Sequence, residues 1–196
     1  VVDSNRGINS TSPYLHPDSN ASEGTGNSTG VSGVSSSSIS LGGGLDYLNA
    51  NSNTYIFYLF RANKGVTTTN STGTVNATQQ VDPSGGFSIS TYAGTGSSMT
   101  VGHGLTAGEP KFTIIKDRGN SVNWVVYTKV VDGSLDYFEL STTAAKGDSG
   151  FTGPNSSIWN FDGSSSYSNT SGRNYVMYNW TNVEGYIKVG TYTGNS

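Results

Sequence analysis

The chain has 196 residues, which is enough for one or two small domains. Charged residues make up 12% of it and the formal net charge is -3, so the composition excludes the basic surface of a nucleic-acid-binding protein and a polybasic membrane contact. Cysteine is absent, which excludes disulfide bonds and thiolate metal sites, and no apolar run approaches the length of a transmembrane helix. We therefore expect no nucleic-acid partner and no membrane insertion.

The residue types predict an all-β protein. The chain contains 12 tyrosines and 27 glycines and is rich in serine, threonine and asparagine. Aromatic and β-branched residues favour strands, whereas glycine, asparagine and serine favour the turns between them. No window shows three turns of an amphipathic helix, and the best helical stretch, residues 142–146, predicts one turn at most.

Short strands are expected along the chain, separated by clusters of Gly, Asn, Asp or Ser. Many short strands with such turns are typical of a sandwich or a barrel. In chain order, the predicted strands are residues 55–60, 87–92, 111–116, 124–129, 137–141, 175–180 and 186–192. Weaker candidates are residues 39–41, 99–101 and 158–161.

Three of the predicted strands carry apolar side chains on both faces. Residues 87–90 alternate between apolar and polar, as a strand with one buried face and one wet face does. Residues 56–60, 124–127 and 175–180 do not alternate. One face of such a strand can fill a sandwich core, and the other must meet a second layer, another module or another subunit. The alternative is that their amphipathic Tyr and Trp rings are partly exposed.

The chain also repeats itself imperfectly. Self-similarity of this kind is typical of arrays whose units bury surface against their neighbours. The alternative is that strands rich in Tyr, Gly and Thr resemble one another by composition alone. The similar segments are residues 1–3 and 125–127, residues 55–60 and 175–180, and residues 87–96 and 185–194.

Two loose stretches and the repeat together predict the domain organisation. Residues 19–38 and 64–83 have the composition of flexible linkers, although an alternative is that their Thr- and Val-bearing segments pair as strands in an assembly. A partial module leaves sheet edges open, and open edges invite pairing with another chain. The predicted regions are a partial β-module (its C-terminal half) at 1–62, a linker at 63–85, a complete β-module at 86–184, and at 185–196 the first strand of a further module or a strand contributed to a neighbour.

A series of motifs carries a resemblance to a known family. They are Val101-Gly102-His103-Gly104-Leu105 and residues 110–116, 123–127, 140–145, 175–178 and 183–195. The series resembles an uncharacterised β-rich repeat domain of marine bacteriophage proteins, many of them tail-fibre-like or virion structural proteins. Residues 1–7 and 15–17 resemble the later half of the companion repeat. The resemblance implies antiparallel β-sandwich modules, jelly-roll or lectin-like, on a virion, and it implies no enzymatic activity.

The sequence offers little catalytic chemistry. His103 lies between two glycines and is expected to cap a turn, and His16 precedes a proline in a loop. Residues 147–150 read Gly-Asp-Ser-Gly, the pattern around the nucleophile of chymotrypsin-like proteases. A triad also needs a base and an orienting carboxylate, and no other feature of that family occurs, so we interpret this segment as a Gly-rich loop.

The carboxylates are scattered and predict no metal or acid–base site. Asp132, Asp136 and Glu139 are close in sequence, but the last two are expected on opposite faces of one strand. A calcium site would need a loop dense in oxygen ligands, and none surrounds Asp46, Asp117 or Asp162. We therefore predict no catalytic residue, no cofactor and no metal ion.

These observations favour a structural module of an extracellular assembly, with a phage fibre or another virion or cell-surface appendage as the first candidate. Copies of the same chain are the expected partners, in an oligomer or filament, and host-surface glycans are a further candidate. The alternative function is a carbohydrate-binding, lectin-like module, in which exposed aromatic rings such as Tyr92, Trp159, Tyr167 and Trp180 stack on sugars, helped by Asn and Asp. The candidate assembly or glycan contacts are Tyr58, Phe60, Tyr92, Trp159, Tyr178, Trp180, Tyr186 and Tyr192.

Overall fold

The protein is all-β, with antiparallel sheets and a single short helix in the part that the structure describes. This computed structural model describes residues 1–26, 30–43, 46–63 and 65–195. Its largest sheet has eight strands in the order β12-β11-β10-β9-β15-β7-β6-β5. Their bounds are β5 (Thr68–Asn70), β6 (Ala77–Val81), β7 (Phe87–Ala93), β9 (Phe112–Asp117), β10 (Val125–Thr128), β11 (Asp136–Glu139), β12 (Gly147–Asp148) and β15 (Asn174–Trp180).

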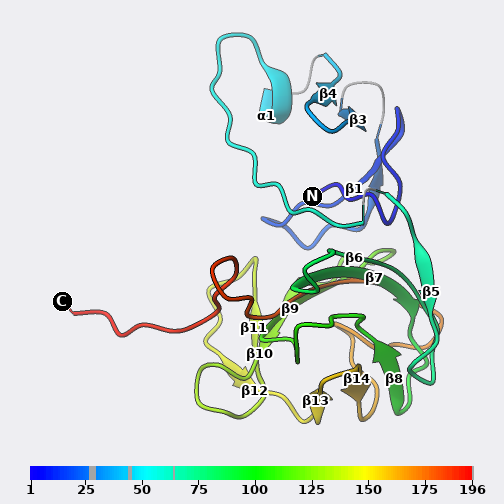
Figure 1. Cartoon of the computed structure of the whole chain (residues 1–196), viewed down its shortest axis with the longest axis vertical. Coiled ribbons are helices and arrows are strands. Elements are labelled where there is room, and N and C mark those ends of the chain that lie inside the picture. Colours follow the sequence, from blue (N-terminus) through cyan, green and yellow to red (C-terminus); the bar gives the residue numbers. More distant parts are fainter. Residues whose placement is uncertain (27–29, 44–45, 64, 196) are drawn as a thin grey trace.

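A smaller sheet covers one face of the large one and completes a β-sandwich. It consists of β13 (Gly153–Pro154), β14 (Ile158–Phe161) and β8 (Met99–Gly102), and it lies beneath the curved large sheet in Figure 1. The main core fills the space between them. Tyr175 and Met177 of the central strand β15 share it with Trp159 and Phe161 of β14, and all four are at most 1% exposed.

The opposite face of the large sheet is covered by the first part of the same chain. Leu15 follows β1 (Pro13–Tyr14), which pairs with β2 (Gly24–Thr25). Leu15 packs in a second core with Trp124 and with Val176 and Tyr178 of β15. Figure 1 shows this segment, in blue, above the large sheet. The two-sided apolar pattern of residues 175–180 therefore meets a second layer in the same chain.

A chain of charged hydrogen bonds fastens this layer to the sheet. The Tyr178 hydroxyl donates to Asp3 Oδ2 at 2.6 Å, and Arg6 Nε donates to the same oxygen at 2.6 Å. Arg6 Nη1 donates to Glu23 at 2.7 Å, and Arg118 binds that carboxylate through both of its oxygens at 2.8 and 2.9 Å. The layer is thus held by buried apolar contacts and by bidentate ion pairing.

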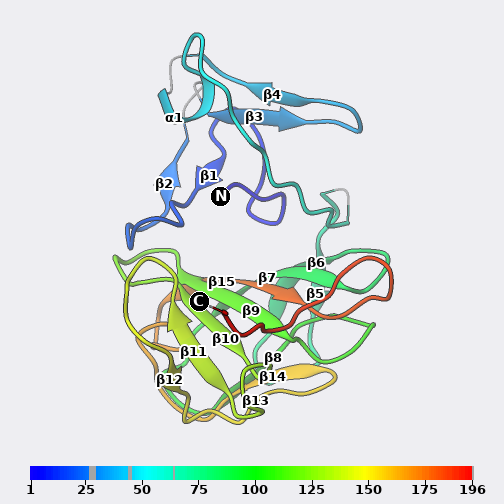
Figure 2. The same ribbon diagram turned by 90° about the vertical axis from the view of Figure 1, so that its left-hand side faces the viewer.

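The remaining elements lie far from the sandwich. A hairpin of β3 (Val31–Val34) and β4 (Ile39–Leu41) and the four-residue helix α1 (Asp46–Asn49) form the tip of the molecule in Figure 2. Residues 50–62 then return to the sheet as an irregular segment (Figure 1). Within the described residues, no helix is long and apolar enough to cross a membrane.

The structure corrects the predicted linker at residues 63–85. Two strands of the large sheet, β5 and β6, lie inside it, and β6 pairs with β7 over four residues. Ala77 and Gln80 of β6 are each 1% exposed. The Thr-rich segment is thus no linker, because it pairs with a neighbouring strand of the same chain. The eight-stranded sheet therefore begins before residue 86, where the complete module was expected to start.

Two predicted strands are wrong. Residues 55–60 and 186–192 have the composition of strands but form none in the structure. A strand needs a backbone partner over several residues. Within the described part of the chain, residues 186–192 have only a single bridge, between Ile187 and Val183, and no backbone hydrogen bond joins residues 56–60 to another described residue. The paired segments of the predicted repeat also differ in structure. Residues 175–180 lie in β15 but residues 55–60 form no strand, and residues 87–93 form β7 but residues 185–194 form no strand. Residues 142–146, for which at most one helical turn was expected, form no helix.

Candidate functional site

Three of the predicted contact residues are buried and cannot reach a ligand or partner at the surface. Tyr92 is 4% exposed, Trp159 0% and Tyr178 6%. Their polar atoms bind inside the protein: the Tyr92 hydroxyl donates to Ser168 O at 2.9 Å, and Trp159 Nε1 donates to Thr113 at 3.2 Å. Buried Tyr and Trp rings usually find such partners. The prediction of these three as contacts is therefore wrong.

The other predicted contact residues lie at the surface or close to it. Tyr58, Phe60, Tyr186 and Tyr192 are 59–95% exposed. Trp180 is half-buried, with its ring centroid 5.5 Å from that of Phe60. The exposed residues come from two regions of the chain, residues 55–60 and the C-terminal residues, which run away from the sheets in Figure 1.

An uninterrupted exposed apolar segment is the first candidate site. Five consecutive large apolar side chains, from Ile56 to Phe60, are 45–83% exposed, and we call these residues the apolar segment. No backbone hydrogen bond joins residues 56–60 to another described residue. At its end, Phe60 packs on Phe87 and Trp180, and Trp180 in turn packs on Phe112. The apolar segment thus joins an aromatic cluster at the sheet.

An open groove of about 410 Å³ is the second candidate site. Tyr137 of β11 and the loop residue Tyr167 line it, with ring centroids 6.2 Å apart, together with Phe151, Asp148 and Asp162. All three rings are half-buried. The Tyr167 hydroxyl donates to Glu139 at 2.5 Å, and this hydrogen bond raises the pKa of Tyr167 to about 12. The groove therefore combines aromatic faces with carboxylates.

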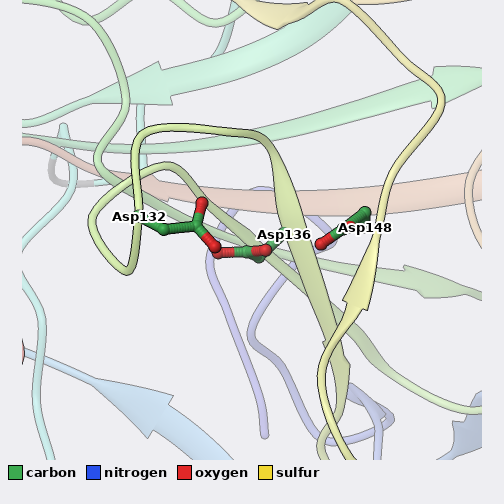
Figure 3. Close-up of side chains that lie close together, drawn as sticks. All are labelled: Asp132, Asp136 and Asp148. Carbon is green, nitrogen blue, oxygen red and sulfur yellow. The ribbon is translucent and has the colours of Figure 1, made fainter.

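Beside the groove, three carboxylates surround one lysine. Asp136 of β11 and Asp148 of β12 face each other in the antiparallel register, and Asp132 comes from the turn before β11 (Figure 3). Lys146 Nζ donates to Asp132 Oδ2 at 2.9 Å, to Asp136 Oδ1 at 2.6 Å and to Asp148 Oδ1 at 3.0 Å. We call these four residues the acidic cluster.

The electrostatics of the acidic cluster follow from these contacts. Hydrogen bonds from the Ser134 hydroxyl and from Lys146 lower the pKa of Asp132 to about 2. The carboxylates raise the pKa of Lys146 above its ordinary value, first among them Asp136. The Asp136 side chain is completely buried, and its Oδ2 has no hydrogen-bond partner within the described part of the chain.

Sequence reasoning missed the acidic cluster because its geometry depends on strand register. Asp132 and Asp136 are close in sequence, but Asp148 lies in the stretch interpreted as a Gly-rich loop. Residues directly opposite in an antiparallel pair share a face. The pairing of β11 with β12 places Asp148 opposite Asp136, and nothing in the linear sequence specifies that register. Tyr137 and Phe151 of the groove were also missed, because the groove is lined by segments that are distant in sequence, whereas Tyr167 was expected to stack on sugars.

The structure does not bring His103 and the serine of the Gly-Asp-Ser-Gly stretch together within the described residues. His103 is completely buried, its Nδ1 accepts from Leu105 N and its Nε2 lies 3.1 Å from Asn155 O. Burial lowers its pKa. Ser149, within the Gly-Asp-Ser-Gly stretch, accepts a hydrogen bond from Phe151 N. Among the described residues no hydrogen bond joins His103 to Ser149, so this histidine keeps the turn-capping role expected from its glycine neighbours.

The fold and these sites define an antiparallel β-domain of the sandwich type with an aromatic groove and an exposed apolar segment. Over its full length, residues 1–196, the chain matches a family described as a domain of unknown function (DUF7483), and it belongs to that family. No curated protein and no solved structure matches the chain.

Proposed function

We propose that the chain is a structural module of an extracellular assembly, a phage fibre or another virion or cell-surface appendage, and that copies of it associate through the apolar segment. The observation that carries the proposal is the run of five exposed apolar side chains from Ile56 to Phe60. Monomeric soluble proteins rarely expose contiguous apolar surface of this kind, and larger patches of it mark interaction sites.

The free energy of burying the apolar segment is comparable to the cost of association. Fully burying one exposed large apolar side chain contributes about 1.5–3 kcal/mol, and these five still expose 45–83% of their surface, so burying them contributes roughly 5–10 kcal/mol. Association itself costs about 4–15 kcal/mol in lost translational and rotational freedom. The apolar segment alone therefore supports weak association. The adjoining Trp180 and Phe112 extend the apolar surface, and burying them as well would make the association tighter.

The edges of the large sheet offer less to a partner. The edge strands β12 and β5 are two and three residues long, and short edge strands are one way in which proteins prevent edge-to-edge pairing. The apolar segment differs, since its backbone is unpaired with other described residues and its side chains face outward. It is therefore the favoured place for a strand from a neighbouring copy.

Residues 186–192 are the favoured partner strand. Tyr186 and Tyr192 are 64% and 95% exposed, and the segment between them contains two β-branched apolar residues. The resemblance to tail-fibre-like repeat domains supports a place on a virion. The proposal includes no enzymatic activity.

The experiment is light scattering after size-exclusion chromatography, combined with electron microscopy of the particles. Wild type is expected to form oligomers or filaments that grow with concentration. The double variant Ile56→Ser/Leu59→Ser is expected to remain monomeric with an unchanged circular dichroism spectrum. Val34→Ser/Leu140→Ser is the control, because it removes two other exposed apolar side chains. A monomeric wild type at every concentration contradicts the proposal, as does assembly that the double variant leaves intact.

A second function, carbohydrate binding, is favoured by the groove. Sugar rings stack on aromatic faces and their hydroxyls bind carboxylates, and the groove offers Tyr137 and Tyr167 beside Asp148 and Asp162. The test is a glycan array with wild type, Tyr167→Ala and the control Tyr192→Ala, whose side chain lies outside the groove. Binding lost only in Tyr167→Ala supports this function. Binding equal in all three proteins, or no binding by any of them, contradicts it.

A further inference from the structure

The acidic cluster leaves one buried carboxylate oxygen unsatisfied. A lysine ammonium has three N–H donors, and Lys146 uses all of them, one for each aspartate. Asp136 Oδ2 therefore receives nothing from Lys146, and no other described residue reaches it, although the Asp136 side chain is 0% exposed. A buried polar atom without a partner is rare in proteins and is often explained by an ion or a water.

The negative charge of the cluster is only partly compensated by Lys146. Three carboxylates face a single ammonium, and none of the ion pairs within the described residues brings a second cation to them. An ion with two positive charges would balance three carboxylates better than the single charge of Lys146 does.

The donor set suits calcium. One oxygen from each aspartate lies within 4.8 Å of the others, which is the spacing of ligands around one ion. Calcium takes six to eight oxygen ligands in flexible geometry, whereas magnesium demands a near-ideal octahedron. The Asp132 and Asp148 side chains are 47% and 76% exposed, so water has access to the remaining coordination positions.

The carboxylates are held in place by the fold, whereas the lysine side chain can move away once its hydrogen bonds are broken. Asp136 and Asp148 are fixed by the pairing of β11 with β12. The turn residue Asp132 uses Oδ1 to accept from Ser134 N and Oγ, which leaves Oδ2 directed at the cluster. Lys146 has a long flexible side chain that is 35% exposed, so it can swing into solvent without disturbing the strands.

We propose that Asp132, Asp136 and Asp148 form a calcium site in which Lys146 is a built-in cation that the ion displaces. The bound ion satisfies Asp136 Oδ2 and lies against the groove, because Asp148 lines both. This inference is independent of the proposed assembly function, which involves other residues.

The experiment measures calcium binding by titration calorimetry and by the thermal unfolding midpoint, Tm. Wild type is expected to bind calcium in the millimolar range typical of extracellular modules. Lys146→Gln is expected to bind at least about tenfold more tightly, because calcium no longer has to break three charge-assisted hydrogen bonds. Without calcium this variant has a lower Tm than wild type, and calcium restores it.

Two further variants separate a calcium site from a simple ion-pair cluster. Asp148→Asn, at the most exposed ligand, keeps the fold and is expected to abolish the calcium-dependent rise in Tm. Glu184→Gln removes an exposed carboxylate outside the cluster and is expected to leave the calcium-dependent rise in Tm unchanged. If millimolar calcium changes neither the heat of titration nor the Tm of wild type and Lys146→Gln, the aspartates serve only to hold Lys146 and the proposal is overturned.

Terbium luminescence excited through tyrosine tests the site on unmodified wild type, and it decides the matter if Lys146→Gln fails to fold. Tyr137 and Tyr167 line the groove beside Asp148, so a terbium ion at the site is expected to emit and calcium is expected to quench the emission by competition. An emission that calcium does not reduce, or no emission, overturns the proposal.

Discussion

Replacing Leu15 with alanine tests whether the first part of the chain is a true layer of the domain. Leu15 is 1% exposed and packs against Trp124, Val176 and Tyr178 on the outer face of the large sheet. Leu-to-Ala changes at such buried sites cost about 2–5 kcal/mol, the transfer term plus the cavity left behind. We expect Leu15→Ala to lower the free energy of unfolding by an amount within this range. Leu48→Ala, at a residue of helix α1 that is only half-buried, is the control, and we expect it to cost far less.

The assay is urea unfolding followed by tryptophan fluorescence. Trp124 Nε1 donates to His16 O at 2.8 Å, so its emission reports directly on contact between the layer and the sheet. A single transition at lower urea concentration in Leu15→Ala indicates that the layer and the sandwich unfold together. An early, separate change in fluorescence indicates a layer that detaches on its own. A loss of stability below about 0.5 kcal/mol would refute the reasoning, because that is the range of ordinary surface substitutions.

Further predictions concern charge, backbone space and the C-terminal residues. Burial raises the pKa of Glu23, but hydrogen bonds from Arg118 and Arg6 outweigh burial and lower the pKa below its ordinary 4.5. The ionised Glu23 carboxylate therefore stabilises the fold above pH 4.5, and this stabilisation fades as the pH falls through the pKa of the folded state. Glu23→Gln should cost about 1–2 kcal/mol at neutral pH and less in acid, measured by urea unfolding; an equal cost at both is contrary to this. Gly73→Ala should lower Tm, since its Cβ would lie 2.3 Å from a backbone oxygen of β8; an unchanged Tm argues against this packing. Deleting residues 185–196 should leave the circular dichroism unchanged but abolish assembly in light scattering, whereas unchanged assembly would remove these residues from the interface.

The fold class was predictable because strand composition and turn composition alternate along the chain. The strands β7, β9, β10 and β15 fall close to their predicted positions, since each carries apolar side chains that the core requires. The same composition led to a wrong prediction of a strand at residues 55–60, where large apolar side chains lie outside any sheet. Composition indicates that a segment favours a strand, but the strand forms only where another backbone is there to pair with it.

The candidate sites were less predictable, because burial and register are properties of the fold. Tyr92 and Trp159 have the same amphipathic chemistry as Tyr58 and Tyr192, and only the packing of the small sheet on the large one places the first two inside. The acidic cluster depends on the pairing of β11 with β12, which brings Asp148 opposite Asp136. Sequence spacing within one strand indicates which residues share a face, but it does not give the residue that lies across from them.

Amide hydrogen exchange of the apolar segment tests the central claim most directly. Peptides that cover residues 55–61 are compared at low and at high protein concentration, with peptides from the buried strand β15 as the internal reference. Because no backbone hydrogen bond joins residues 56–60 to another described residue, these amides should exchange rapidly in the dilute protein. They should become protected as the protein assembles. Assembly that proceeds while these amides stay unprotected would contradict the account.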